Sequence, residues 1–232
     1  MGGVVDIREG ASWLPQGWVY RNVQENLADA LEEQDGQLSI LLRQSTIGID
    51  YCTLTDLSPD RFQLLLFHLE RVYYRTAEAC LASPKQKGSF TLYLSEASVF
   101  KALLRTDPRN AEDLSRKSRI VLGESTRWAA PLWVYDFVLE QWATATYLSK
   151  PDVAEGLLNA SSFKGKEECD LRHIEPTTFQ VLLSHSDGMT RRYSGGFEAE
   201  AREFFAEMNP CLRTLVNSMQ SDPRAQEHNS SS

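Results

Sequence analysis

The sequence predicts an α+β fold, in which antiparallel hairpins pack with several helices. Strand-like segments lie toward both ends of the chain, helical apolar patterns fill its middle, and their spacing is too uneven for a regular alternation of strand and helix. The chain has 232 residues, of which 42% are apolar, so it can bury a core without disulfide bonds. No internal period appears. We expect one domain over residues 1–220, or two subdomains divided near 125 or 160, and a disordered tail over 221–232.

The first third of the chain predicts a helix between extended segments. Residues 1–22 hold several aromatic side chains around Pro and Gly, which is typical of a short extended segment. Over 23–34, apolar and acidic residues separate onto two sides with helical spacing, so we expect an acidic helix there. Residues 38–43 and 47–54 are rich in β-formers and predict a hairpin.

The next segment predicts a long helix over residues 59–82. Ser58 can cap this helix, Pro59 suits its first position, and apolar residues recur at i, i+3, i+4 and i+7. A short strand is expected over 90–94, and a second helix follows it until Asp107-Pro108 breaks the pattern.

The second half of the chain predicts the centre of the core. A strand is expected over 119–122, closed by Gly123. The segment 131–148 is apolar nearly all round, which indicates a buried central helix. We expect a short helix over 151–158 and a loop over 159–170.

The last elements predicted are a hairpin and a helix. Ser186-Asp187-Gly188 separates two β-rich segments, 177–184 and 189–193, and Asp-Gly supplies the positive-φ positions that a tight turn needs. An amphipathic helix should follow the next glycines, and Pro210 should end or kink it.

Charge and cysteine usage exclude several classes of function. The net charge is −8, so the excess of Lys and Arg that attracts nucleic acid or anionic lipid is missing, and we expect neither partner. The four cysteines lack the close spacing of a zinc site and indicate free thiols in a reducing compartment. No export signal or membrane span is recognised. We therefore expect a cytoplasmic protein without cofactor or metal.

The negative charge is concentrated near the N-terminus. Residues 1–70 hold 4 basic and 11 acidic side chains, whereas residues 71–232 hold 20 and 21. An acidic surface can attract a basic partner and accelerate association. The helix expected over 23–34 and its end supply four acids as candidate partner-binding residues: Glu25, Asp29, Glu32 and Glu33.

A second candidate surface lies on the helix over 59–82, opposite its core stripe. Four residues there recur at helical spacing: Phe67, Arg71, Tyr74 and Glu78. Aromatic side chains mixed with arginine are typical of the residues that dominate protein interfaces. The alternative is a helix that is covered on both faces.

The candidates for catalysis are few. Asp136 and Glu140 are four residues apart, so both project from one helix face, as acid–base chemistry requires. No histidine accompanies them at helical spacing, and a solvent-facing strip explains the pair as well. The histidines have no metal-ligand spacing: His68, His173, His185 and His228.

A weak anion-binding site is indicated near the C-terminal end. Arg191 and Arg192 precede Gly195 and Gly196 at the expected start of a helix. Guanidinium groups and backbone N–H groups at such a place can hold a phosphate or carboxylate. A tight turn uses the same glycine pair, and the complete phosphate-binding motifs are missing.

These observations favour a non-enzymatic cytosolic protein-binding domain that acts through an acidic surface. In general character, and by no motif, the chain resembles bacterial immunity proteins, which neutralise toxin domains. That resemblance implies a basic toxin domain as the partner. The alternatives are an enzyme of unrecognised family that binds a small anionic substrate, and a structural or assembly subunit. The sequence identifies neither the partner nor the oligomeric state.

Overall fold

The chain folds into two compact units, Met1–Glu112 and Asp113–Ser232. A computed structural model describes residues 2–48, 50–82, 87–110, 115–194 and 202–226. The boundary between the units precedes both of the divisions that the sequence suggests, near 125 and near 160.

The first unit is built on a small mixed sheet. Its central strand β1 (Val4–Arg8) pairs antiparallel with β2 (Ala11–Trp13) and parallel with β3 (Tyr51–Thr53). The strand order is therefore β2-β1-β3. Alternate residues of β1 are buried, which is the pattern of a strand with one face on the core.

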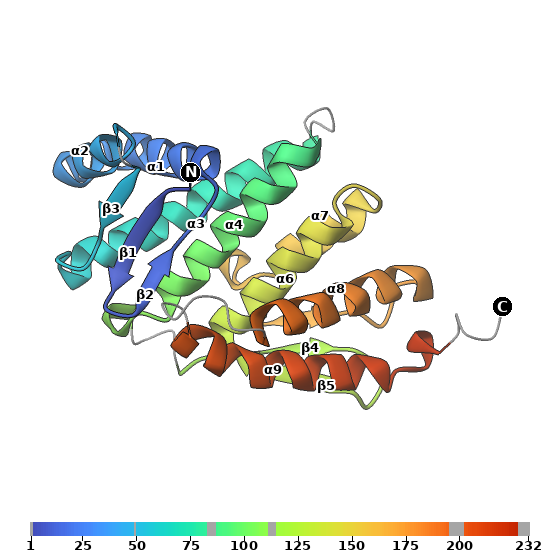
Figure 1. Cartoon of the computed structure of the whole chain (residues 1–232). Helices are drawn as coiled ribbons and strands as arrows, with labels where there is room; N and C mark the ends of the chain where they lie inside the picture. Colours follow the sequence, from blue (N-terminus) through green and yellow to red (C-terminus); the bar gives the residue numbers. More distant parts are fainter. Residues whose placement is uncertain (1, 49, 83–86, 111–114, 195–201, 227–232) are drawn as a thin grey trace. The chain divides into compact units, whose positions relative to one another are not determined.

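Helices cover this sheet in two pairs (Figure 1). Between β2 and β3 the chain forms α1 (Gly17–Leu31) and α2 (Gly36–Ser45). After β3 it forms α3 (Pro59–Ala82) and α4 (Lys87–Arg105), and the short 3-10 helix η2 (Pro108–Asn110) follows.

The second unit has a sheet of the same kind. Its central strand β4 (Lys117–Val121) pairs antiparallel with β5 (Arg127–Pro131) and parallel with β6 (Glu168–Asp170). The strand order is β5-β4-β6.

The helices of the second unit also come in two pairs. α6 (Leu132–Thr146) and α7 (Pro151–Asn159) lie between β5 and β6, with the short 3-10 helix η3 (Ser162–Lys164) after them. Two long helices follow β6, namely α8 (Pro176–Ser194) and α9 (Arg202–Gln220), and the 3-10 helix η5 (Pro223–Ala225) comes last.

The two units therefore share one fold. In each, an antiparallel hairpin, two helices, a strand parallel to the first, two further helices and a short 3-10 helix follow one another, and the strand order is the same. This structural repeat is not visible as an internal period of the sequence. The residues that recur are few and far apart in the sequence, as the following three contacts show.

An arginine fixes the end of the first unit. Arg109 of η2 donates hydrogen bonds to the carbonyl oxygens of Leu54 (2.7 Å) and Ile7 (2.7 Å). It also pairs with Asp107 (2.7 Å), and its guanidinium lies 3.9 Å from the ring centre of Phe62. The side chain thus connects β1, the end of β3, the start of α3 and η2. We call this set of contacts the arginine clamp.

The second unit repeats the arginine clamp contact by contact. Arg224 of η5 donates to the carbonyl oxygens of Leu171 (2.7 Å) and Leu122, pairs with Asp222 (2.8 Å) and lies 4.1 Å from the ring centre of Phe179. The arginine and the carbonyl that it reaches at the central strand are 102 residues apart in both units, Arg109 from Ile7 and Arg224 from Leu122.

Two aromatic side chains recur as well. The Tyr20 hydroxyl donates to the carbonyl of Ser45 at the end of α2 (3.2 Å), and the Tyr135 hydroxyl donates to the carbonyl of Ala160 after α7 (2.6 Å). In the same way, the indole N–H of Trp13 in β2 and that of Trp128 in β5 each donate to a backbone carbonyl of the last long helix of their unit, at 3.0 Å.

The predicted α+β class is confirmed, and several elements are confirmed with it. α3 spans the predicted residues 59–82, and α7 covers the helix expected over 151–158. The strand expected over 119–122 overlaps β4. The segment 131–148 contains α6, which buries residues on every side and forms a central part of its unit's core.

The first predicted hairpin is wrong, because its first arm is a helix. Residues 38–43 belong to α2, and residues 47–54 contain the short strand β3. Asp35 explains the difference: its side chain accepts a hydrogen bond from the backbone N–H of Leu38 (3.0 Å) and so caps α2.

The second predicted hairpin is also wrong, because residues 177–193 lie within α8. Asp187 and Gly188 form no turn there. Asp187 pairs with Arg191 one helical turn later (2.5 Å), and Gly188 lies on the exposed side. Burial of the apolar residues at helical spacing therefore outweighs the local turn signal.

Two smaller predictions also fail. The strand expected over 90–94 lies inside α4, and the loop expected over 159–170 contains η3 and β6. Pro210, which we expected to end or kink its helix, does not end it but lies inside α9. No helix in the described parts of the chain is both long and apolar enough to cross a membrane.

Candidate functional site

The four acidic residues predicted to bind a partner gather on one side of α1 and of the turn that continues it. Glu25, Asp29, Glu32 and Glu33 are all exposed, and their spacing places them within about a third of the helix circumference. The opposite side of α1 is buried against α2, α3 and α4. We call these four residues the acidic face of α1.

One cation from α2 touches the acidic face of α1. Arg43 pairs with Asp29 (2.6 Å) and with Glu32 (3.1 Å), and all three side chains are largely exposed. Such surface pairs contribute about 0–1 kcal/mol to stability. Within the described part of the chain, Glu25 and Glu33 form no ion pair, so the face keeps a net negative charge.

The position of these acids does not favour the helix itself. Asp29, Glu32 and Glu33 lie at the C-terminal end of α1. The first turn of α1 holds no acidic residue, and its last turn holds no basic residue. The helix dipole favours cations at this end, and a carboxylate there costs about 0.3–1 kcal/mol. Local stability therefore does not explain the acidic face of α1.

The stripe predicted on α3 does not form one surface. Phe67 is 48% exposed, with the Arg71 guanidinium 5.4 Å from its ring centre, and Glu78 is exposed. Tyr74, however, is only 2% exposed and packs edge-on against Tyr73. The expectation that Tyr74 binds a partner is corrected, because its ring lies in the core.

The carboxylate pair on α6 is buried rather than solvent-facing. Asp136 and Glu140 are both 0% exposed. Asp136 accepts hydrogen bonds from the backbone N–H of Ser162 (2.8 Å) and from the Ser162 hydroxyl, so it holds the start of η3. The strip expected to face solvent is thus part of the interior, and Asp136 has a structural role there.

The three histidines in the described part of the chain do not form a metal site. His68 is buried, with Nε2 3.1 Å from Oε1 of Gln34, and burial together with nearby arginines lowers its pKa. His185 is half-buried, and burial lowers its pKa too. His173 is exposed, and His228 lies outside the described residues. Among the residues described, no cluster of His, Cys, Asp and Glu could hold a metal ion.

The predicted anion site is only partly described. Arg191 pairs with Asp187, and the Arg192 guanidinium lies 5.7 Å from the ring centre of Tyr193. Both arginines are in the last turn of α8, where the helix dipole favours cations. Gly195 and Gly196 lie outside the described residues.

The thiols are suited to the core rather than to nucleophilic chemistry. Cys52, Cys80 and Cys169 are buried, Cys211 is half-buried, and all four are free. Burial raises the pKa of Cys52 and Cys80 to about 11 and that of Cys169 to about 12. These thiols are therefore protonated near neutral pH and weak as nucleophiles.

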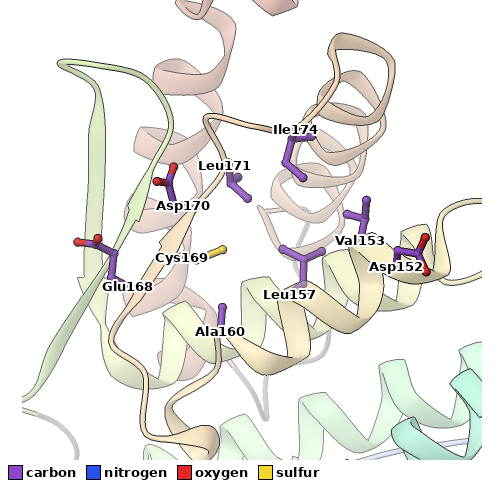
Figure 2. A pocket seen from close by; sticks show the side chains of 10 residues that line it. Asp152, Val153, Leu157, Ala160, Glu168, Cys169, Asp170, Leu171 and Ile174 are labelled. Carbon is purple, nitrogen blue, oxygen red and sulfur yellow. The ribbon is translucent and has the colours of Figure 1, made fainter.

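Sequence reasoning missed a cavity of about 340 Å³ in the second unit, between α7 and β6. Figure 2 shows the side chains of Leu157, Cys169 and Leu171 turned toward the gap, whereas the carboxylates of Glu168 and Asp170 point away from it. The lining is therefore mainly apolar. We call this cavity the α7–β6 groove.

The sequence contains one signal for the groove, namely a glycine inside a helix. Gly156 lines the groove, and a Cβ atom at this position would meet no other atom within 4 Å. A glycine in a helix interior is unfavourable by about 1 kcal/mol relative to alanine, so it often has a packing or functional reason.

Comparison with protein-family models, with curated proteins and with solved structures finds no match for the chain. The function is therefore inferred from the chain's own residues.

Proposed function

We propose that this protein is a non-enzymatic, cytoplasmic binding protein whose acidic face of α1 attracts a basic partner protein. The general resemblance to bacterial immunity proteins makes a toxin domain, which the protein would neutralise, the partner class to test first. The observation that carries the proposal is the gathering of four exposed acids on one side of a helix, three of them at the end where the helix dipole disfavours them.

Electrostatics explains what such a face can do. Charges on exposed side chains act over a Debye length of about 10 Å at 0.1 M salt, so neighbouring carboxylates on one face attract a cationic surface together. Attraction of this kind raises the association rate and favours partners with matching charge.

Nothing in the described part of the chain favours the alternative, an enzyme with a small anionic substrate. Asp136 and Glu140 are shielded from solvent, Asp136 serves the start of η3, and the groove found in the second unit is mainly apolar. An anionic substrate would instead need cationic or N–H groups around its pocket.

Affinity capture with matched charge variants tests the proposal. Glu25→Gln/Glu33→Gln removes two charges that form no ion pair, and Glu9→Gln/Glu207→Gln removes two exposed charges elsewhere. The wild type and the second variant should retain a stoichiometric basic protein from cell extract, and the first variant should lose it. Equal retention by both variants, or turnover of a small molecule by the purified protein, would overturn the proposal.

A further inference from the structure

The α7–β6 groove lies beside an unpaired strand edge. β6 is an outer strand of its sheet, bonded to β4 on one side, and no strand in the described parts of the chain pairs with its other side. Arg119 donates to the carbonyl of Glu167, and Leu171 donates to the carbonyl of Val121, so residues 167, 169 and 171 face β4. The N–H and C=O groups of Glu168 and Asp170 consequently lie on the outer edge.

The groove combines this edge with an apolar hole. Its lining comes from α7 and the residue after it, from β6 and from the residues just after β6, and includes none from β4. The groove therefore runs along the outer side of β6. Val153, Leu157 and Ile174 contribute aliphatic surface, and Cys169 contributes a thiol. A chain lying here can pair with backbone groups and place a side chain in the hole.

The first unit offers a comparison for the position of Gly156. The recurrent tyrosine contacts align α2 with α7, because they end at Ser45 and Ala160. On this alignment Leu41 of α2 occupies the position of Gly156. α2 is in direct contact with β3. The first unit thus carries a half-buried leucine at the position where the α7–β6 groove has an exposed glycine.

The charge at one end of the groove indicates which residue type a bound chain should carry there. Asp152 lies at the N-terminal end of α7 and lines the groove, and Glu155 is exposed in the same turn. Within the described residues neither forms an ion pair, whereas Glu168 and Asp170 are paired with Arg119 and Arg172. One end of the groove is therefore negative.

We propose that the α7–β6 groove binds an extended peptide segment of a partner protein. The segment adds a strand to the outer edge of β6, inserts an aliphatic side chain between α7 and β6, and places a Lys or Arg near Asp152. Main-chain pairing supplies affinity in such strand addition, and the pocket for alternate side chains supplies specificity. This site is in the second unit and does not depend on the acidic face of α1.

Capped seven-residue peptides of alternating pattern, Lys-Thr-Val-Thr-X-Thr-Lys with X as Leu, Ile, Val or Phe, are suitable probes. Titrated into the full ¹⁵N-labelled chain, at least one should shift the amide signals of Gly156, Glu168 and Asp170 and slow the hydrogen exchange of the last two. If none of the four does so, or if a scrambled peptide does so equally, the proposal is overturned.

Backbone N-methylation tests the strand addition itself. Successive N–H groups of a strand point to opposite edges, so one peptide is methylated at its threonines and another at Val and X. One form should lose binding at least tenfold and the other should keep it. Equal binding of both forms, or binding of 1-heptanol alone in the groove without any peptide, would assign the cavity to small apolar molecules and overturn the proposal.

The leucine of the first unit supplies the blocking variant. Gly156→Leu should weaken peptide binding at least tenfold, and Gly188→Leu, at an exposed helix position with equal free space, should leave it unchanged. Both variants should melt at the same or a higher temperature, because leucine favours a helix more than glycine does. Unchanged binding by a folded Gly156→Leu chain would contradict the proposal. The Glu25→Gln/Glu33→Gln variant should bind the peptide normally, which separates this test from that of the acidic face.

Discussion

The two units keep the same internal contacts but present different surfaces. Tyr20 and Tyr135 make the same hydrogen bond, and a glutamate follows each tyrosine five residues later. Glu25 is exposed, whereas Glu140 is fully buried. α1 thus has one apolar side and one charged side, and α6 is buried all round. The arginine clamp, the tyrosine and the tryptophan therefore define the fold, and the remaining helix positions are available for different functions.

A second difference concerns one residue of the helix that precedes the outer strand in each unit. Leu41 in the first unit corresponds to Gly156 in the second, where the groove opens. The first unit accordingly carries a candidate site that depends on charge, the acidic face of α1. The second carries one that depends on shape, the α7–β6 groove.

The largest expected effect comes from removing an arginine clamp. Arg224→Ala removes the ion pair with the buried Asp222 and the side-chain donor to the carbonyls of Leu171 and Leu122, and we expect a loss of about 3 kcal/mol in the free energy of unfolding. Arg109→Ala should cost a similar amount. Urea unfolding followed by circular dichroism measures both, with the exposed Arg213→Ala as control. A loss below about 0.5 kcal/mol for either clamp, the range of ordinary surface changes, would refute the shared framework.

A smaller effect, a gain in stability, is expected at a buried position that is polar in the first unit and apolar in the second. Gln24 is 0% exposed, and neither its amide nitrogen nor its amide oxygen has a hydrogen-bond partner among the residues that the structure describes. Leu139 occupies the corresponding position of α6. Gln24→Leu should raise the free energy of unfolding by about 1–2 kcal/mol, because it removes an unsatisfied buried amide. The exposed Gln44→Leu should change it little. Destabilisation by Gln24→Leu would show that the amide has a partner that matters.

The recurrent tyrosine bonds should have similar, smaller effects. Tyr20→Phe and Tyr135→Phe each remove one hydrogen bond to a carbonyl, and we expect each to cost about 1 kcal/mol. Burial is the main cause that raises the pKa of Tyr20 to about 12 and also raises that of Tyr135. Thermal melts compare the two variants. A cost in one unit and none in the other would mean that the two bonds are not equivalent.

The smallest expected effect is a change in stability at acidic pH. Burial raises the pKa of Asp107, but the hydrogen bonds and charge of Arg109 outweigh it, so the pKa is lowered; the hydrogen bond from Arg224 lowers that of Asp222. Stability from a carboxylate with a lowered pKa is complete above its ordinary pKa, near about 4, and is lost as the pH falls through the folded-state value.

Asp222→Asn should therefore lose its disadvantage relative to the wild type as the pH falls from about 5 toward 2. Urea midpoints at stepped pH measure this. A gap between the two proteins that stays constant over this range would contradict the lowered pKa.

The sequence predicts those elements whose signals are local. Ser58 and Pro59 with a regular apolar stripe locate α3, and the apolar run at 131–148 locates α6. Asp187-Gly188 misleads because a turn pair can also lie on the exposed side of a helix. The repeat stays hidden because its shared residues meet only after folding, as Arg224 and Leu122 do across 102 residues.

The candidate sites also differ in whether a local sequence pattern predicts them. The acidic face of α1 follows from charge and helical spacing, so it is predictable. Tyr74 is misplaced because its burial depends on neighbours from α4, for example Lys101, whose Nζ lies 4.8 Å from its ring centre. The groove needs the distance between α7 and β6, which no local pattern contains.

The association rate between the protein and its captured partner tests the proposed function most directly. We predict that the wild-type rate constant falls at least tenfold between about 20 mM and 200 mM salt, since screening weakens steering by the acidic face of α1. Glu25→Gln/Glu33→Gln should associate several-fold more slowly at low salt, and Glu9→Gln/Glu207→Gln should match the wild type. A rate that is independent of salt and equal in all three proteins would contradict a function based on the acidic face of α1.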